Sequence, residues 1–446
     1  MCSEAPTGGP MTDDVATEQS AAFLLDAERI QKYLAFGFVP TYPDEPLTLL
    51  ADWSRRPKLR ADEVDVGDLV RAGVTALHSA IEQCAERGPG TGQQVVLLSG
   101  GLDSRAILGG LLEHFDRSEV VAATFGMPGE RDYDFAAAVA AAAGVRHERL
   151  ETASVEWTTE GLVGSVLARH LPLPFPFGQR YLSYLLHTRL GRENTFWDGL
   201  CGDAVSGDWA PAEDEVWDWP SAVEDFLKVH LLPGTAPLLP DTFDPAADIP
   251  TEPFHPAELL TFPEQLDHGV RQRCYTGTRR LRDYRINTPF LTGAWLDFML
   301  SAPPRYRYDQ HLYKEVLKAA FPRLFSLPTT LHGGPLVESG ASRLARGARA
   351  RVRKTADRLR LPTGAARPDA NARIRSAYRR PGPIQDLVRA NLTDLAGRDL
   401  VDETALRSAL AGYGPHADSL VTITLGLELN LKAAERQARA EPGPRP

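Results

Sequence analysis

The feature that most constrains the fold is an apolar run that ends abruptly in a short, glycine-rich turn. Residues 95–104 read Val-Val-Leu-Leu-Ser-Gly-Gly-Leu-Asp-Ser, and residues 105–112 follow with the apolar spacing of an amphipathic helix. A short β-rich apolar run that is bounded by a turn predicts a buried parallel strand. The turn therefore joins the end of a strand to the N-terminus of a helix.

Such a turn is suited to bind an anion. Gly100 and Gly101 free backbone N–H groups, the dipole of the following helix attracts negative charge, and the hydroxyls of Ser99 and Ser104 add donors. We expect a phosphate group there. Asp103 would repel a phosphate, and a magnesium ion between the two removes that conflict. The lysine of the GxxxxGK[ST] loop and the GxGxxG dinucleotide pattern are both absent from this turn.

Strands and helices alternate beyond the turn. The sequence predicts strands at 120–125, 147–150 and 194–197, and a helix at 134–143. This alternation indicates an α/β fold, a parallel twisted sheet with helices on both faces, followed by a largely helical C-terminal portion. Ligands of such sheets bind beyond the carboxyl ends of the strands.

The turn SGGLDS resembles the pyrophosphate loop of N-type ATP pyrophosphatases, which split ATP between its α- and β-phosphates. Its form most resembles the asparagine synthetase branch, and residues 23–40 resemble the segment that opens the synthetase domain there. A fortuitous turn before a helix is the alternative. The resemblance implies an adenine nucleotide α-hydrolase-like fold that uses ATP and Mg²⁺. It places these residues at the nucleotide: Ser99, Gly100, Gly101, Leu102, Asp103, Ser104, Thr124, Phe125, Gly126 and Gly202.

A second glycine-rich segment, 196–208, reads FWDGLCGDAVSGD. It resembles the family loop that carries the other magnesium-binding aspartate, and Asp203 falls on that residue. The resemblance thus implies that Asp103 and Asp203 hold one Mg²⁺ against the triphosphate. Taken alone, a loop of this composition is more often a plain turn.

Residues 284–322 resemble the family's run of a Pro-Phe-Leu-Asp motif, a helix, a proline turn and a lysine-bearing helix, and we expect this region to be helical. Thr292 replaces the usual acid of the motif. Lys314 and Lys318 lie four residues apart on one helical face, where they would contact pyrophosphate or the substrate carboxylate. The alternative for Lys314 is a solvated surface residue.

Two positions depart from the family pattern. Leu200 stands where relatives carry a glutamate or tyrosine that helps to deprotonate the amine nucleophile, and leucine cannot do so. Leu331 or His332 stands near the family's catalytic lysine. His332 is a candidate base or electrostatic group because imidazole titrates near neutrality, and a plain surface histidine is the alternative.

Bulk properties set further limits. A formal net charge of −10 makes nucleic acid an unlikely partner for the surface as a whole. No stretch approaches the roughly 20 apolar residues that cross a bilayer, and residues 1–20 lack the features of a secretory signal. We therefore expect a cytoplasmic protein without membrane contact. The four cysteines have no metal-ligand spacing.

We expect a disordered tail at 1–20, an ATP pyrophosphatase domain at 21–335, and a basic, helical extension at 336–446 that packs on it. Residues 343–380 are rich in arginine. We favour a solvated helix that pairs with the acidic remainder of the chain. An acidic peptide, a carrier protein or nucleic acid are the alternatives.

The resemblance implies an AMP-forming, ATP-dependent carbon–nitrogen ligase without a glutaminase domain. It would adenylate a small-molecule or peptide carboxylate and transfer the acyl group to an amine, in a biosynthetic or natural-product pathway. β-Lactam synthetases and lasso peptide cyclases use an amine that is already in the substrate. Ammonia from solution or from a separate protein is the other source. An RNA-modifying ATP pyrophosphatase and a non-catalytic nucleotide-binding relative are the alternative functions.

Overall fold

The computed structural model describes residues 26–40, 57–87, 90–169, 177–211, 217–272, 281–331, 333–337, 374, 376–411 and 417–440. These residues build one five-stranded sheet in the order β3-β2-β1-β4-β5, in which all neighbouring strands are parallel. The strands are β1 Gln94–Leu97, β2 Val120–Gly126, β3 Arg146–Glu151, β4 Thr195–Trp197 and β5 Arg285–Asn287.

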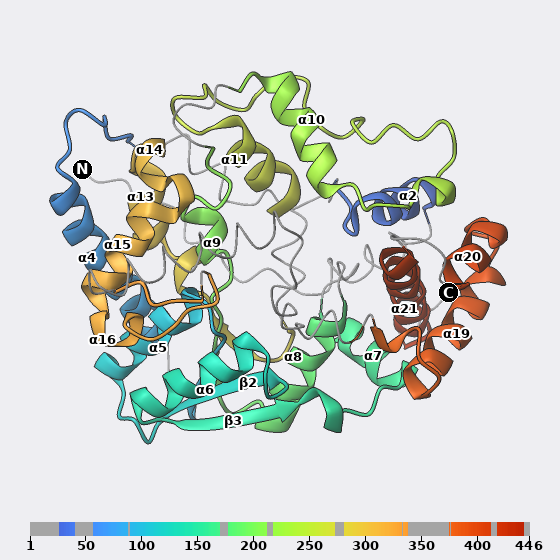
Figure 1. Ribbon diagram of the computed structural model, residues 1–446, viewed down its shortest axis with the longest axis horizontal. Helices are drawn as coiled ribbons and strands as arrows, with labels where there is room; N and C mark the ends of the chain where they lie inside the picture. The colour runs from blue at the N-terminus through green and yellow to red at the C-terminus, as the bar shows by residue number, and fades with distance from the viewer. Residues whose placement is uncertain are drawn as a thin grey trace, which may run out of the picture.

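Helices surround the sheet and form the C-terminal portion (Figure 1). They are α2 Ala27–Phe36, α4 Val66–Glu86, α5 Asp103–His114, α6 Arg131–Ala143, α7 Thr159–Leu167, α8 Phe177–Leu190, α9 Gly202–Val205, α10 Trp219–His230, α11 Phe262–Leu266, α13 Gly293–Ser301, α14 Pro304–Arg307, α15 His311–Ala320, α16 Pro322–Phe325, α19 Pro383–Ala396, α20 Glu403–Leu410 and α21 Ala417–Ala440. A π-helix at Asp267–Arg271 directly follows α11.

The predicted α/β fold is confirmed, and the sheet has a clear switch point. β1 is the central strand, and its Val95 lies beside Val121 of β2 on one side and Phe196 of β4 on the other. The chain runs outward from β1 through β2 to β3, and then returns to place β4 on the opposite side of β1. Parallel sheets bind ligands at such a reversal. The loops after β1 and β4 therefore share the expected position of a site.

The sheet is buried on both faces because helices cover each of them, and consecutive residues of a strand point to opposite faces. Val96 packs in a core with Ile107 of α5 and Leu77 of α4. Val95, on the other face, packs with Leu186 of α8. Continuous apolar strands are typical of sheets that are covered in this way.

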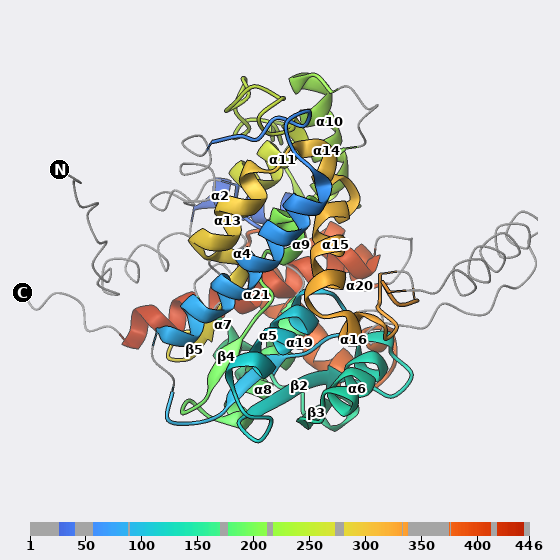
Figure 2. The same ribbon diagram turned by 90° about the vertical axis from the view of Figure 1, so that its left-hand side faces the viewer.

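Helices α4, α13 and α15 lie side by side over the sheet (Figure 2). Gly73 of α4 makes the close contact possible, because a Cβ atom there would lie 2.3 Å from Val316 of α15 and 2.7 Å from Phe298 of α13. No side chain fits in that space. The packing fixes α15, which carries Tyr313 and Lys314, next to the carboxyl ends of the strands.

Two local expectations are corrected. Helix α5 begins at Asp103, two residues earlier than the apolar pattern suggests, because the pattern marks only the buried side of the first turn. The segment expected to be wholly helical opens with strand β5, whose three residues, Arg-Ile-Asn, are too few and too polar to show an apolar run.

The C-terminal helices share a hydrophobic core with the N-terminal part of the chain. Leu425 and Leu429 of α21 are buried together with Leu34 of α2 and Val163 of α7.

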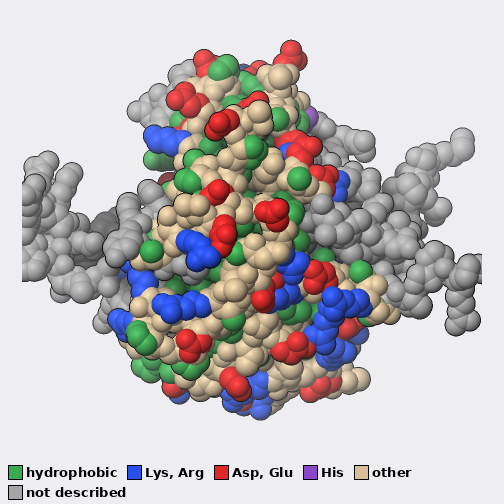
Figure 3. Space-filling view, turned by 90° about the vertical axis from the view of Figure 1, so that its right-hand side faces the viewer, with side chains coloured by type: hydrophobic (Ala, Val, Ile, Leu, Met, Phe, Trp, Pro, Cys, Tyr) green, Lys and Arg blue, Asp and Glu red, His purple; other side chains and the backbone are tan. Residues whose placement is uncertain are grey.

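On the face at the right of Figure 1, acidic and basic side chains are interspersed (Figure 3), as on an ordinary solvated surface. The tail at 1–20 and most of the basic segment lie outside the described residues. Within that segment, Arg379 donates to Asp418 at 2.9 Å.

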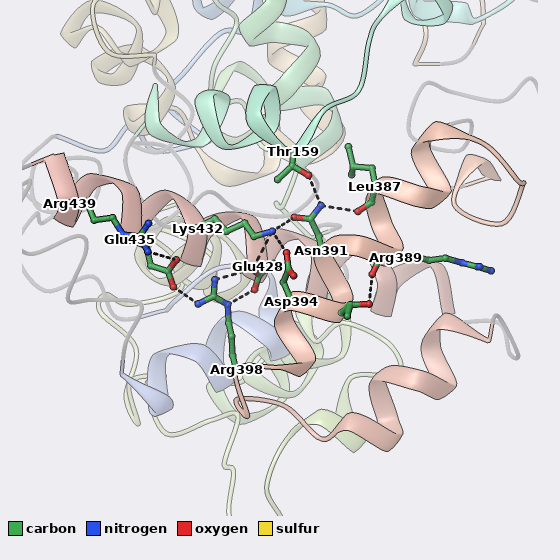
Figure 4. Close-up of polar contacts among 11 residues, drawn as sticks. Thr159, Leu387, Arg389, Asn391, Asp394, Arg398, Glu428, Lys432, Glu435 and Arg439 are labelled. Carbon is green, nitrogen blue, oxygen red and sulfur yellow. Dashed lines mark hydrogen bonds and ion pairs between the residues drawn. The ribbon is translucent and has the colours of Figure 1, made fainter.

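A polar network joins α19 to α21 (Figure 4). Arg398 donates from Nε and Nη2 to the two carboxylate oxygens of Glu428 at 2.6 and 3.0 Å, and it also pairs with Glu435. Lys432 bonds Asn391 and Asp394. Because Glu428 is completely buried, its charge depends on these partners.

Glu428→Gln is therefore expected to lower the free energy of unfolding by about 3 kcal/mol, since it leaves Arg398 without its two-point partner. Chemical denaturation monitored by circular dichroism measures this. The control is Glu403→Gln in the exposed Glu403–Arg407 pair, with an expected change below about 1 kcal/mol. Equal changes in the free energy of unfolding for the two substitutions would show that the buried pair stabilises the fold no more than the exposed pair does.

Candidate active site

The loops that follow β1 and β4 lie in direct contact at the switch point. A Cβ atom at Gly199 would lie 2.6 Å from Cβ of Asp103, and one at Gly202 would lie 2.5 Å from its Cγ. Cys201, between these glycines, has φ of 64°, which is uncommon for a residue with a side chain. The second loop is thus folded tightly against Asp103, and Asp203 follows at the start of α9.

The N–H groups of the first loop donate to neighbouring side chains. The Ser99 N–H donates to Oγ of Ser104 at 3.0 Å, and the Gly101 N–H donates to Oγ of Ser99 at 3.1 Å. The Gly100 N–H donates to a carboxylate oxygen of Asp132 at 3.1 Å. An acidic group therefore already accepts from this loop, which supports its suitability for anions.

Helix α5 begins without a side-chain cap. Leu102 stands at the N-cap position, is buried, and makes no capping hydrogen bond. The first N–H groups of a helix have no partner within it. Asp103 and Ser104 occupy the first turn, so the predicted site residues surround a helix N-terminus that favours negative charge.

Asp103 is the electrostatic centre of the site. Burial of its carboxyl group, together with the negative charges of Asp203, Asp208 and Asp198, raises its pKa to about 8. The Tyr313 hydroxyl opposes this rise by donating to Oδ1 of Asp103 at 2.6 Å. Without a cation, the group carries a proton at neutral pH, so the site has an excess of negative charge that a cation would relieve.

The donor set fits Mg²⁺. Asp203 is exposed, and its Oδ1 accepts from the Ala204 N–H at 2.8 Å, which orients the carboxylate. Among the described residues, no three acidic, cysteine or histidine side chains form a preformed metal cage. Magnesium commonly uses one or two carboxylates and completes its shell with water and substrate phosphates. Asp103 and Asp203 could supply those two carboxylates.

The raised pKa of Asp103 predicts a pH dependence. A cation must displace the proton, so the affinity for Mg²⁺ should rise with pH up to about 8 and level off above it. Calorimetric titration of Mg²⁺ with a non-hydrolysable ATP analogue at pH 6.5, 7.5 and 8.5 measures this. Asp103→Asn should remove the dependence. A flat profile in the wild-type protein would contradict the assignment.

Lys314 is buried, with 9% of its surface exposed, which excludes a solvated surface lysine. Its ammonium group binds Oδ2 of Asp309 at 2.9 Å and also the Asp309 carbonyl. Asp309 and Gln310 have φ of 47° and 55°, a strained pair of non-glycine residues directly before α15. Lys318 instead pairs with Glu315, partly exposed.

The end of β2 is held by side chains rather than open to a ligand. The Thr124 hydroxyl donates to the Leu98 carbonyl at 2.7 Å and contacts Nε2 of His147 at 2.9 Å. Phe125 is partly buried, and Gly126 has φ of 147°, a value that favours glycine. Only the backbone of this strand end is left for the predicted adenine contact.

The structure gives the departures from the family pattern a physical setting. Leu200 is 2% exposed and belongs to the core, so it does not face a substrate. Leu331 is 41% exposed in a turn, and His332 lies outside the described residues. Thr292 is buried, and its hydroxyl donates to the Pro289 carbonyl, a local role.

Three contributors were missed by the sequence analysis. Tyr313 and Arg105 bond across more than 200 residues, and the π-helix at 267–271 brings Nε2 of His268 to 3.2 Å from the Ala204 carbonyl. The available signal was a polar atom within an apolar helical stripe, at Arg105 and at Tyr313. That signal does not identify the residue to which the polar atom bonds.

Two facing loops at a switch point, with an uncapped helix and two carboxylates, define a nucleotide-binding α/β fold. Residues 81–205 match the family described as asparagine synthase, a span that contains both loops. This span is therefore similar to an asparagine synthase domain, which supports a relation to ATP-using amide ligases. No curated protein matches the chain. None of the described helices is both long and apolar enough to cross a membrane.

Proposed function

We propose that the chain is an AMP-forming ligase that adenylates a substrate carboxylate and transfers the acyl group to an amine, in a biosynthetic pathway. The observation that supports this most strongly is the contact between the two loops, which sets Asp203 beside Asp103 on the first turn of α5. This arrangement suits a triphosphate whose charge must be neutralised at one end.

In the first step, a carboxylate oxygen of the substrate bonds to the α-phosphorus of ATP, and the bond to the β-phosphate oxygen breaks to release pyrophosphate. Mg²⁺ held by Asp103 and Asp203 would supply charge neutralisation there. The N-terminus of α5 would bind the phosphates, together with N–H groups of the 99–104 loop once these exchange their bonds to Asp132 and to the serine hydroxyls for bonds to phosphate. Lys314 pairs with Asp309. Once this ion pair opens, the ammonium group of Lys314 offers a positive charge for the departing pyrophosphate. His332 is the candidate for stabilising the acyl-adenylate.

In the second step, the amine nitrogen bonds to the acyl carbon, and AMP leaves. The amine must lose a proton, and the buried Leu200 cannot accept it. A group at another position must therefore accept the proton. The acyl group is transferred either to an amine within the same substrate or to free ammonia, and both are compatible with the first step.

The nucleotide products test the proposal. Wild-type protein is incubated with ATP, Mg²⁺, ammonium and a panel of carboxylates, and products are resolved by ³¹P NMR. The proposal expects AMP and pyrophosphate in a carboxylate-dependent amount. ADP and phosphate would reject this reaction class. Binding of ATP without any product across the panel would favour a non-catalytic relative.

A further inference from the structure

We propose that Arg105 is a positioning residue that fixes the peptide between Gly100 and Gly101 in the pyrophosphate loop and holds Thr329 and Thr330 against that loop. The inference rests on the proposed function, because it concerns the same loop. Arg105 touches neither the phosphates nor the reacting atoms in this account. It acts through the backbone.

Arg105 is the third residue of α5, and its side chain is completely buried. Its guanidinium donates to four carbonyl oxygens, at distances of 2.8 to 3.3 Å, and its carbon lies 5.6 Å from the centre of the Phe325 ring. The four carbonyls belong to Leu324, Leu327, Pro328 and Gly100. Within the described part of the chain, no carboxylate pairs with it.

The bond to Gly100 has a geometric consequence. The carbonyl of Gly100 and the N–H of Gly101 belong to one planar trans peptide, so they point in opposite directions. Arg105 and the Thr330 N–H both donate to that carbonyl, at 3.3 and 3.0 Å. The Gly100 carbonyl is thereby held on the inner side, and the Gly101 N–H is directed away from Arg105, where it donates to Oγ of Ser99 at 3.1 Å.

The same contacts position the segment that follows α16. Thr330 is bound to the Gly100 carbonyl, and Thr329 closes a turn by donating from its N–H to the Gly334 carbonyl at 2.9 Å. A Cβ atom at Gly100 would lie 2.6 Å from Cγ2 of Thr330. The turn therefore rests directly on the loop.

Arginine is required for this arrangement because its planar fork presents five donors in fixed directions, whereas lysine has three on one nitrogen. Burial lowers the pKa of Arg105 to about 10, and the group stays charged at neutral pH. A charge solvated by carbonyls alone lies beneath a loop that binds a polyanion, and it adds a favourable field there.

The test compares Arg105→Lys with Arg169→Lys. Arg169 is also buried and donates to the carbonyls of Ser165 and Arg180, and neither of these bonds reaches the pyrophosphate loop. For each variant, calorimetry gives the dissociation constant for Mg-ATP, and hydrogen exchange reports protection in residues 99–104 and 324–337. Thermal unfolding shows how far each fold is weakened.

Arg105→Lys is expected to weaken Mg-ATP binding at least about tenfold and to speed exchange in both segments, because bonds to a charged donor are lost. Arg169→Lys should lower the unfolding temperature without either change. A folded Arg105→Lys protein with wild-type affinity and exchange would overturn the inference. If Arg105→Lys does not fold, Arg105→Gln takes its place, and a folded variant with wild-type affinity and exchange would also overturn the inference.

This outcome is separable from the proposed function. Wild-type protein that binds Mg-ATP but forms no AMP defeats the proposed function and leaves the positioning test intact. Wild-type protein that forms AMP, with an unaffected Arg105→Lys variant, defeats only the positioning role. A rise in KM for ATP at constant kcat in Arg105→Lys would support the inference, because it shows that the substitution weakens nucleotide binding by the loop and leaves the chemical step unchanged.

Discussion

Asp103→Asn is expected to lower the rate of ATP–pyrophosphate exchange by about 100-fold or more, because in the proposed function Asp103 is a charged ligand of the Mg²⁺ that neutralises the transferring phosphate. The protein should remain at least as stable as the wild type. Asparagine resembles the protonated carboxyl group that the raised pKa indicates at neutral pH, and it ends the repulsion from Asp203.

Loss of exchange combined with retained stability would separate a functional carboxylate from a structural one. The matched control is Asp116→Asn, an exposed aspartate that follows α5 and should change neither property. Wild-type exchange in Asp103→Asn would contradict the site. A fold weakened by several kcal/mol would instead show that Asp103 is structural.

Gly202→Ala is expected to be the most damaging loop substitution. Its Cβ would lie 2.5 Å from Cγ, 2.7 Å from Oδ1 and 3.0 Å from Oδ2 of Asp103, and the neighbouring side chains are closely packed. One of the two loops after β1 and β4 must therefore move, and this movement separates the carboxylates of Asp103 and Asp203. We expect exchange to fall about 100-fold or more and the free energy of unfolding to fall by about 1–3 kcal/mol.

Gly293→Ala provides the comparison. Gly293 begins α13, and a Cβ atom there would have its nearest neighbour at 4.0 Å. Alanine should leave activity intact and stabilise the protein by up to about 1 kcal/mol. Thermal unfolding and pyrophosphate exchange measure both variants. Full activity of Gly202→Ala would show that the contact between the loops does not matter for function.

Local sequence predicted what depends on local physics. The run from Val95 to Ser104 predicts strand, loop and helix, and the structure contains all three. The second loop was identified by its resemblance to the family loop, because its composition alone predicts only a turn after a strand. By contrast, β5 is a strand only because it pairs with β4, and three residues of which two are polar carry no such signal.

The contacts that complete the site were not predictable in the same way. Tyr313 reaches Asp103 because α15 packs on Gly73, and Arg105 binds carbonyls that lie about 220 residues further along the chain. Such partners follow from tertiary packing. The burial of Lys314 and its pairing with Asp309 likewise depend on a strained turn that composition does not reveal.

The most direct test of the central claim is exchange of ³²P-labelled pyrophosphate into ATP by the wild-type protein, with Mg²⁺ and a panel of carboxylates. Exchange requires that a carboxylate displace pyrophosphate reversibly from ATP, and it needs no amine. We predict label in ATP only when a suitable carboxylate is present, with loss of the signal in Asp103→Asn. Mg-ATP binding without exchange for any carboxylate, or undiminished exchange in Asp103→Asn, would contradict the account.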